Sequence, residues 1–550
     1  MRLPKIPLAQ TVVQLCIAKG IKHIVISPGS RNAPLTIGFT NHPFFECYSI
    51  VDERSAAFVA LGIAQQTQTP VAVVCTSGSA LLNYYPAIAE AYYSDIPMVV
   101  LSADRPEHLI NVGDGQTINQ KGVYSGHILY EANLTEEGSK DDQREINNAI
   151  NTCIEQQGPV HINIPFNEPL YELVEEFNTE ISPVTTTPAN WNEDVSAYKN
   201  IWRSAKRKLV LVGSNYPNSV AQKYLDILAK DDSVIVFTET TSNLNNDEFF
   251  PSIDKIIAPL DHNGFEQLQP EVLLTFGGMI VSKKIKAFLR KYQPKEHWHI
   301  DPKKAFDTFF CLKKHFKGSV NEVLGQLLDD QIIQQSDYKA HWSNIKLYRQ
   351  TKHEEYLDRV EYSDLKVFQS LLNTLPNKAL LHCGNSSTIR YMQLFHINSS
   401  LDVFCNRGTS GIDGSTSTAV GASMVSSQQT VFITGDLSFF YDSNALWNNY
   451  IPPSFRIIVI NNSGGGIFRI LPGHKNTTNF DTYFETKHDL KASHLCNMYG
   501  FQYSRADSIE EIEQEMKHFY KEGDQPKLLE IFTPRKVNDT VLLNYFEKLK

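Results

Sequence analysis

The chain has 550 residues, of which 42% are hydrophobic and 20% charged, with a formal net charge of −10 and a pI near 6.0. Domains of roughly 150 residues are typical, so a chain of this length exceeds a single core, and its composition excludes a largely disordered protein. The acidic balance argues against a nucleic-acid-binding protein, whose affinity comes largely from Lys and Arg that neutralise phosphates.

The eight cysteines are scattered and form no Cys-x-x-Cys pair, which argues against a disulfide framework or a structural zinc site. The N-terminus carries no long apolar stretch before a small-residue cleavage site. No segment approaches the roughly 20 apolar residues needed to span a bilayer. We therefore expect a cytoplasmic protein without a membrane span.

Short apolar runs followed by Gly/Ser-rich loops and helical patterns recur along the chain, which is typical of βα units on parallel sheets. In the first third, this pattern predicts strands at 23–26, 47–51, 71–75, 97–101 and 160–164. A helical pattern runs from about residue 80 to Tyr93. A polar stretch with two prolines, 178–192, is predicted to be a linker.

The same pattern continues beyond the linker, and residues 320–362 are polar, aromatic and helix-like. Further strands are predicted at 208–212, 233–237, 272–276, 297–300, 379–382, 431–434, 457–460 and 528–531. We find no short sequence repeat. The sequence therefore predicts an α/β protein of three doubly wound domains with parallel sheets, at 1–180, 193–340 and 355–550.

One motif indicates a cofactor site: Gly435-Asp436 is followed, after 24 intervening residues, by Asn461-Asn462. Asp436 follows the 431–434 strand, and a helix at about 442–450 with the 457–460 strand would return the chain to the same sheet edge, where α/β folds bind ligands. Asp436, Asn462 and the Gly464 carbonyl are hard oxygen donors that suit Mg²⁺, with Mn²⁺ as an alternative, beside a diphosphate. Such dipeptides also occur by chance in loops.

Two further features favour the functional interpretation. Glu53 follows the 47–51 strand and opens the segment 55–62, which is too apolar for an exposed helix. The segment 407–414, Arg-Gly-Thr-Ser-Gly-Ile-Asp-Gly, precedes Gly435 by one βα unit and offers backbone N–H groups to a diphosphate.

These features together resemble the thiamine-diphosphate-dependent enzyme superfamily. The resemblance implies a pyrimidine-binding, a central and a diphosphate-binding domain in that order. Glu53 would hydrogen-bond the aminopyrimidine ring of a cofactor held by the other subunit, so the active unit would be at least a homodimer, with a tetramer as the alternative. The implied cofactor-binding residues are Glu53, Thr76, Gly78, Gly408, Ser410, Ile412, Asp436, Leu437, Ser438, Asn462, Gly465, Ile467 and Phe468.

A closer resemblance is to the branch of this superfamily that serves menaquinone biosynthesis, a resemblance that runs from about residue 10 to 535. It rests on five strings, at 26–31, 76–80, 103–106, 406–414 and 461–468 with Leu471-Pro472. The implied reaction decarboxylates 2-oxoglutarate and adds the remaining four-carbon unit to the ring of isochorismate. Both substrates are dicarboxylates, for which arginine forks are well suited.

The resemblance also implies site residues. Glu53, Arg31, Ser386, Arg390 and Arg407 are the implied catalytic residues. Ser386, Arg390 and Arg407 would hold the chain derived from 2-oxoglutarate. The implied isochorismate contacts and pocket walls are Ser30, Arg31, Arg105, Gln116, Lys283, Lys284, Ile467, Phe468 and Leu471. Two positions depart from the family pattern: Lys283-Lys284 replaces a Lys-Arg pair, and Asp114-Gly115 stands where an Asn-type side chain is common.

Other functions fit less of the sequence. An acetolactate-synthase-like enzyme or a simple 2-oxo-acid decarboxylase would handle smaller substrates with fewer arginines, and residues 193–340 show no nucleotide-binding signature. A non-catalytic homologue that binds the cofactor would not need Glu53 together with Asp436 and Asn462. A Rossmann dehydrogenase is disfavoured because no strand leads into a Gly-x-Gly-x-x-Gly helix start.

Overall fold

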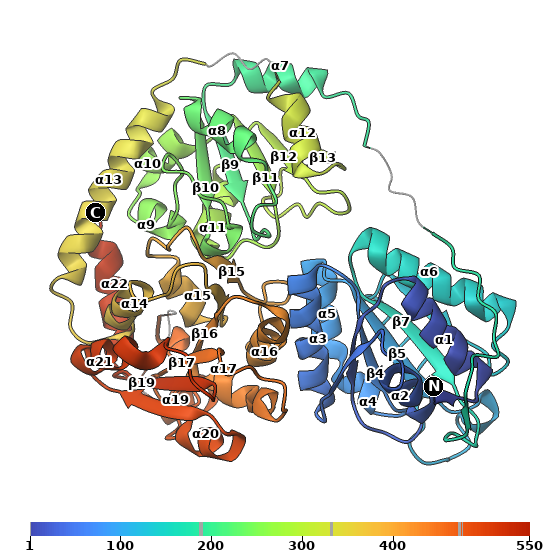
Figure 1. Ribbon diagram of the computed structural model, residues 1–550. Helices are drawn as coiled ribbons and strands as arrows, with labels where there is room; N and C mark the ends of the chain where they lie inside the picture. The colour runs from blue at the N-terminus through green and yellow to red at the C-terminus, as the bar shows by residue number, and fades with distance from the viewer. Residues whose placement is uncertain (1, 186–190, 330–333, 471–474, 476) are drawn as a thin grey trace.

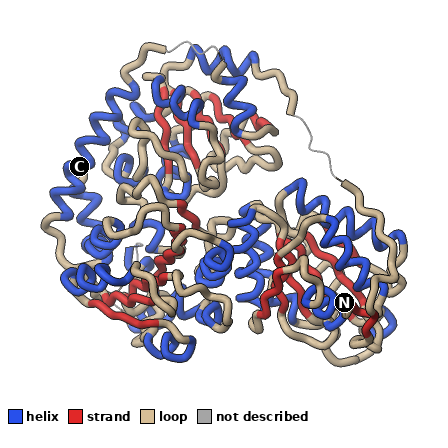
Figure 2. The backbone as a smooth tube through the Cα atoms, in the orientation of Figure 1, coloured by secondary structure: helices blue, strands red, loops and turns tan. Residues whose placement is uncertain are grey.

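The computed structural model describes residues 2–185, 191–329, 334–470, 475 and 477–550. Within them the chain forms three α/β units around three fully parallel sheets, with a two-stranded antiparallel pair between β1 (Leu3–Pro4) and β8 (Leu173–Val174). Figure 2 shows the three sheets, each covered by helices. The predicted architecture of three doubly wound units is confirmed. A bilayer-spanning apolar helix is absent from the described residues.

The N-terminal unit has the strand order β3-β2-β4-β5-β7-β6. Its strands are β2 (His23–Ile26), β3 (Glu46–Ser49), β4 (Val71–Cys75), β5 (Met98–Asp104), β6 (Tyr130–Asn133) and β7 (Val160–Pro165). Its helices are α1 (Pro7–Ala18), α2 (Ala33–Thr40), α3 (Glu53–Thr67), α4 (Ala80–Asn83), α5 (Tyr85–Ser94), η1 (Glu107–Leu109) and α6 (Lys140–Gln156). The central strands are fully buried, as expected of apolar runs covered on both faces.

The central unit has the strand order β10-β9-β11-β12-β13. Its strands are β9 (Lys208–Val212), β10 (Val234–Thr238), β11 (Val272–Phe276), β12 (Glu296–Ile300) and β13 (Lys314–Phe316). Its helices are α7 (Ser196–Ser204), α8 (Gln222–Lys230), η2 (Thr240–Ser242), α9 (Ile253–Ile257), α10 (His262–Leu268), α11 (Lys283–Lys291) and α12 (Val320–Leu327). The long helix α13 (Tyr338–Leu357) descends from this unit to the next beside the C-terminal helix (Figure 1).

The C-terminal unit has the strand order β15-β14-β16-β17-β19-β18. Its strands are β14 (Leu380–Cys383), β15 (Asp402–Phe404), β16 (Thr430–Gly435), β17 (Arg456–Asn461), β18 (Gln502–Ala506) and β19 (Lys527–Phe532). Its helices are α14 (Asp364–Leu372), α15 (Ser387–Met392), α16 (Ser415–Val425), α17 (Asp436–Tyr441), η3 (Ser443–Leu446), α18 (Ile467–Ile470), α19 (Thr478–Tyr483), α20 (Ser493–Tyr499), α21 (Ile509–Phe519) and α22 (Asn538–Lys548).

The N-terminal and C-terminal units share one topology. Numbered along the chain within each unit, both sheets have the order 2-1-3-4-6-5. The two units pack through α3 and α16, which cross closely (Figure 1). A Cβ atom on Gly62 would lie 2.1 Å from the Thr418 carbonyl oxygen, and one on Gly421 would lie 2.0 Å from the Val59 carbonyl oxygen. Glycine is therefore required at both positions for this backbone approach.

The predicted helix at 442–450 is wrong. The helix α17 begins at Asp436 itself and ends at Tyr441, and only the short 3-10 turn η3 follows. The Asp436 carboxylate accepts a hydrogen bond from the next amide, in the first helical turn where a negative charge is favourable. Downstream, Pro452 and Pro453 exclude a continuing helix.

Candidate active site

The carboxyl ends of β14 and β16 meet at the point where the strand order of the C-terminal sheet reverses, which is where open α/β sheets bind ligands. Asp436 lies at this edge and is 2% exposed. Its Oδ1 accepts the Leu437 amide at 2.6 Å, and its Oδ2 accepts the Gly464 amide at 3.0 Å. The structure thus places the loop after β17 directly against Asp436, as the motif predicted.

Asn462 is held in one orientation by a residue that the motif did not include. Its Nδ2 donates to Asp364 Oδ2 at 3.0 Å, and Asp364 Oδ1 accepts the Thr533 hydroxyl at 2.6 Å. Burial raises the pKa of Asp364 to about 6. Asn462 Oδ1 is buried and has no hydrogen-bond partner among the described residues. A buried amide oxygen without a donor beside a carboxylate fits a hard divalent cation.

No group of three or more His, Cys, Asp or Glu side chains suited to a metal occurs in the described parts of the chain. The donor set at this edge is instead mixed, with the Asp436 carboxylate, the Asn462 amide and the backbone of Gly464. His488 also reaches this set, with Nε2 3.3 Å from Asp436 Oδ2. Such a mixed oxygen set resembles sites in which a diphosphate completes the metal's coordination.

The glycine-rich loop after Asn462 is anchored by α19 and the residues that follow it. Gly464 has φ +146°, which L side chains rarely adopt. The Gly465 amide, which belongs to the predicted cofactor-binding set, donates to the Glu485 carbonyl at 2.6 Å, so this amide is not a free donor for the cofactor. The Glu485 carboxylate pairs with Arg469 and, at 2.7 Å, with Arg535.

The predicted pocket walls lie on α18. Ile467 is partly buried, and Phe468 is 37% exposed with its ring centroid 6.3 Å from that of Phe484. Leu471 was predicted to complete this wall but lies outside the described residues.

The loop 407–414 reaches the Asp436 edge through Ile412 and Ser438. The Ser438 hydroxyl donates to the Ile412 carbonyl at 2.7 Å, and the Ile412 side chain is 37% exposed. Ser410 has φ +61°, and its hydroxyl donates to the Arg407 carbonyl. The Gly408 amide was expected to face a diphosphate. It donates instead to Glu90 Oε1 at 2.7 Å, so this donor is already occupied, because helix α5 abuts the loop.

Ser386, Arg390 and Arg407 surround one side of the same edge. Ser386 has φ +67° and ψ −124°, a strained conformation for a residue other than glycine and one that is frequent at functional sites. Arg407 donates through Nη1 to Asn385 Oδ1 at 2.6 Å. The Nε atoms of Arg390 and Arg407 are buried without a hydrogen-bond partner in the described chain. Burial and the neighbouring Arg407 lower the pKa of Arg390.

Two carboxyl groups of the central unit, Glu239, which is buried, and Asp254, which is partly buried, lie near these arginines and were not predicted. Glu239 accepts the amides of Val281 and Ser282 at 2.7 and 2.8 Å, and burial raises its pKa to about 7, although the charge of Arg407 opposes the shift. Burial also raises the pKa of Asp254, against the charges of Lys284 and Arg390. A sequence search for carboxylates after strands would have found Glu239, which follows β10 directly.

Lys283 and Lys284 are exposed at the start of α11. The Lys284 ammonium lies 4.8 Å from the centroid of the Phe546 ring, so one of the two predicted cations points toward α22.

The other predicted substrate residues gather at the reversal point of the N-terminal sheet, after β2 and β4. The Arg31 amide donates to the Thr76 hydroxyl at 3.3 Å. A Cβ atom on Gly78 would lie 3.1 Å from the Gln116 carbonyl oxygen. Ser30 is exposed beside Arg31. Three predicted isochorismate contacts, Ser30, Arg31 and Gln116, are therefore brought together with Thr76 and Gly78, which were predicted to bind the cofactor.

Arg31 and Arg105, the two arginines predicted to contact isochorismate, are partly engaged within the N-terminal unit. Arg31 donates to the Phe166 carbonyl at 2.9 Å and to Glu168 at 3.3 Å. Arg105 donates to the Gly115 carbonyl at 3.0 Å and lies 3.7 Å from Asp114. The unusual Asp114-Gly115 pair therefore holds Arg105.

Glu53 is the first residue of α3, and Asp52 caps this helix by accepting the amides of Arg54 and Ser55. The start of α3 is fixed to the end of α17 and to η3: Arg54 donates to the Tyr441 carbonyl at 2.9 Å, and Asn444 donates to Asp52 at 2.7 Å. Glu53 itself is half-buried and accepts a long hydrogen bond from Asn83 at 3.4 Å. Its carboxylate is thus held at the boundary between the N-terminal and C-terminal units.

Comparisons with known proteins agree with this arrangement. Three family models match the chain in order: the N-terminal thiamine pyrophosphate (TPP)-binding domain of thiamine pyrophosphate enzymes at 6–123, the middle domain at 177–383, and the C-terminal TPP-binding domain at 383–531. The fold, the Asp436 edge and these matches define a thiamine-diphosphate enzyme.

Full-length relatives narrow the class. The chain is 58% identical to the 2-succinyl-5-enolpyruvyl-6-hydroxy-3-cyclohexene-1-carboxylate synthase of Christiangramia forsetii and 55% identical to that of Flavobacterium johnsoniae, with all of each chain covered. It is 39% identical to the synthase of Porphyromonas gingivalis over 96% of this chain and 94% of the relative. The chain belongs to the family of 2-succinyl-5-enolpyruvyl-6-hydroxy-3-cyclohexene-1-carboxylate synthases.

Proposed function

We propose that this chain decarboxylates 2-oxoglutarate and adds the resulting four-carbon unit to isochorismate, forming 2-succinyl-5-enolpyruvyl-6-hydroxy-3-cyclohexene-1-carboxylate for menaquinone biosynthesis. Family membership over the full length supports this reaction. The structural observation that carries the proposal is the pair of arginines Arg390 and Arg407 beside the Asp436 edge, whose buried Nε atoms lack partners among the described residues. A dicarboxylate substrate supplies the acceptors that these donors lack.

Thiamine diphosphate, when bound, supplies the electron sink that allows a 2-oxo acid to lose CO₂. We assign its diphosphate and a Mg²⁺ or Mn²⁺ ion to Asp436, Asn462 and the Gly464 backbone, with Leu437 and Ser438 at the start of α17. Ile412 lies against Ser438 and would support the cofactor rings. Because Gly408 and Gly465 donate elsewhere, the diphosphate donors are the remaining amides of these loops. Glu53 would share a proton with the aminopyrimidine ring.

The substrate roles are divided between the two sheet edges. We assign the distal carboxylate of 2-oxoglutarate to Arg390 and Arg407 with Ser386, since charge-assisted hydrogen bonds are strongest in a desolvated site. Isochorismate is assigned to the group at the N-terminal edge, with Lys283 and Lys284 supplying further positive charge. Its members are Ser30, Arg31, Arg105 and Gln116. Ile467 and Phe468 exclude water from the space between.

Three features complete the proposal. The domains are 1–180, 193–340 and 355–550. The enzyme acts in the cytoplasm as a homodimer or a larger oligomer, in which Glu53 serves the cofactor of the partner subunit. The same-chain contact of α3 with the end of α17 is compatible with this, because it leaves Glu53 half-buried at the edge of its unit.

The test is direct. The protein is incubated with thiamine diphosphate, Mg²⁺, 2-oxoglutarate and isochorismate, and the adduct is sought by mass spectrometry. Pyruvate replaces 2-oxoglutarate in a parallel reaction. Formation of the adduct from 2-oxoglutarate is expected. Preferential use of pyruvate would refute the proposal in favour of an acetolactate-type enzyme.

A further inference from the structure

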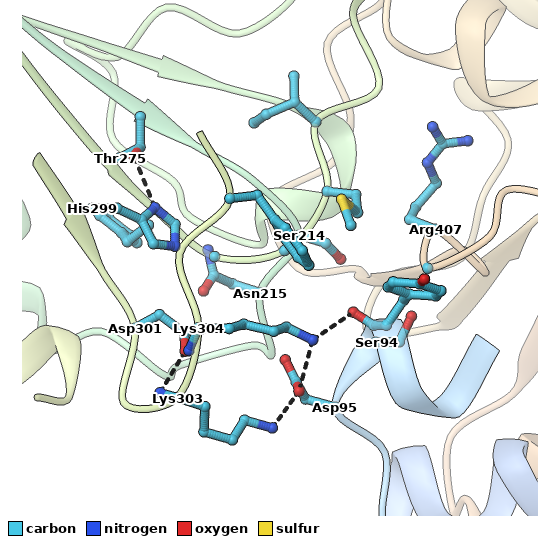
Figure 3. Close-up of a pocket in the computed structure, with 18 of the residues that line it drawn as sticks. Ser94, Asp95, Ser214, Asn215, Thr275, His299, Asp301, Lys303, Lys304 and Arg407 are labelled. Carbon is cyan, nitrogen blue, oxygen red and sulfur yellow. Dashed lines mark hydrogen bonds and ion pairs between the residues drawn. The ribbon is translucent and has the colours of Figure 1, made fainter. Parts of the chain in front are cut away.

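The C-terminal end of α5 connects the N-terminal unit to both other units. Asp95, which follows the helix, pairs with Lys303 and with Lys304 of the central unit, the latter at 3.0 Å (Figure 3). Lys304 also donates to the carbonyls of Tyr92 and Tyr93 at 3.2 Å. Glu90, slightly more than one turn earlier on the same helix, faces the C-terminal unit instead.

The Glu90 carboxylate is 1% exposed and is fully used by hydrogen bonds. Oε1 accepts the Gly408 amide and the Ser94 hydroxyl, both at 2.7 Å. Oε2 accepts the Thr409 amide at 2.7 Å and the Thr409 hydroxyl at 2.8 Å. Three of the four donors belong to a loop of another unit. Two successive amides that point at one anion form a binding concavity, and here a side chain of the N-terminal unit fills it.

The same loop is held from its other side by Asn385. Asn385 Nδ2 donates to the carbonyls of Asn406 and Gly411 at 2.7 and 2.8 Å. Its Oδ1 accepts Arg407 Nη1 at 2.6 Å. Asn385 therefore binds the carbonyls at the two ends of the loop, while Glu90 binds the amides in its middle. Arg407 lies between these two fixed points, immediately before the first amide that Glu90 binds.

We propose that Glu90 is a positioning residue, which sets the direction of the Arg407 guanidinium by fixing the backbone of Gly408 and Thr409. This inference rests on the proposed function, in which Arg407 binds 2-oxoglutarate. It explains why the buried Glu90 carboxylate binds Gly408 and Thr409, which lie in another unit and more than 300 residues later in the sequence. A Cβ atom on Gly408 would lie 2.7 Å from the Glu90 carbonyl oxygen, so helix and loop are in direct backbone contact.

Glu90→Gln tests this in the full-length holoenzyme. The substitution keeps the volume but leaves one acceptor oxygen where two are needed, so one loop amide faces an NH₂ group. We expect faster hydrogen–deuterium exchange in residues 405–411 and a KM for 2-oxoglutarate raised by about 10- to 100-fold, as for other supporting contacts. The KM for isochorismate and the affinity for thiamine diphosphate should not change. Thr409→Val, which removes only the hydroxyl donor, should produce a smaller change of the same kind.

Asp95→Asn is the matched control on the same helix. Asp95 has φ +57° and ψ +50°, a left-handed conformation that Asn tolerates, so the variant loses only charge toward Lys303 and Lys304. It should leave the exchange of residues 405–411 and the KM for 2-oxoglutarate unchanged. Equal effects of both variants would show that Glu90 only docks the units together and would overturn the proposal.

Tighter binding of thiamine diphosphate by Glu90→Gln would also overturn it, because the two amides would then serve the cofactor. If the wild type did not turn over 2-oxoglutarate, the proposed function would fail, and the exchange of residues 405–411 would still decide the positioning role.

Discussion

Removing the acceptor that orients Asn462 should weaken metal binding without touching a metal ligand. Asp364 Oδ2 is the acceptor for Asn462 Nδ2 at 3.0 Å, and Asn462 Oδ1 is thereby aimed away from Asp364. In Asp364→Leu, the Asn462 side-chain NH₂ group would be a buried donor without an acceptor, which costs about 1–3 kcal/mol. The Asn462 side chain can recover this energy only by rotating to find another acceptor, and this rotation moves Asn462 Oδ1 away from the metal position.

The same energy sets the size of the effect. Since 1.4 kcal/mol is a factor of ten, the Mg²⁺ concentration that half-saturates cofactor binding should rise by about 5- to 150-fold. The assay is a Mg²⁺ titration at fixed thiamine diphosphate, followed by circular dichroism or calorimetry, so it does not depend on turnover. Thermal unfolding of the variant without Mg²⁺ serves to separate a folding defect from a metal defect.

Asp364→Asn is the matched control. Its amide oxygen can still accept from Asn462, and its NH₂ group can donate to the Thr533 hydroxyl, which is also an acceptor. This variant should bind Mg²⁺ nearly as well as the wild type. An unchanged Mg²⁺ requirement in a folded Asp364→Leu protein would refute the argument that the orientation of Asn462 matters.

Three further predictions test other parts of the site. Glu53→Gln should keep the fold and most of the cofactor affinity but lose exchange of the cofactor's C2 proton, measured by NMR; exchange at the wild-type rate would remove Glu53 from the mechanism. Arg390→Ala should lower kcat/KM for 2-oxoglutarate by about 30- to several-thousand-fold and lower kcat/KM for isochorismate far less. Arg31→Ala should have the reverse effect. Equal losses for both substrates in both variants would refute the division of roles. Burial raises the pKa of Asp442 to about 7 although Ser417 donates to it, so the folded state retains a proton that the unfolded state releases near pH 4. The unfolding free energy of the wild type relative to Asp442→Asn should therefore fall as pH rises from about 4 to 7 and stay level above that, and a pH-independent difference in denaturant titrations would contradict this assignment.

The sequence by itself determined most strands of the three sheets and the meeting of Asp436 with the loop after β17, because both depend on local patterns. It did not predict four edge strands, β6, β13, β15 and β18. Buried parallel strands are continuous apolar runs, and β2, β4, β9 and β11 match their predicted residues at both ends. The Gly435-Asp436 and Asn461-Asn462 pairs are tied to the ends of two adjacent strands, so their meeting follows from the βα pattern. The local pattern failed at 442–450, where the short 3-10 turn η3 stands in place of a regular crossover helix.

Only the tertiary structure showed that the first and third sheets share one strand order, since no short sequence repeat accompanies it. It also identified Asp364 and Glu90, which act on partners 98 and more than 300 residues away. Neither carboxylate carries a local signal, because a lone Asp or Glu in a helix is usually solvated. Glu90 is buried where the N-terminal unit packs on the C-terminal unit, and Asp364 is buried by tertiary contacts within the C-terminal unit, which no periodicity within one segment encodes. Tertiary contacts also engage the Gly408 amide, with Glu90, and the Gly465 amide, with the Glu485 carbonyl.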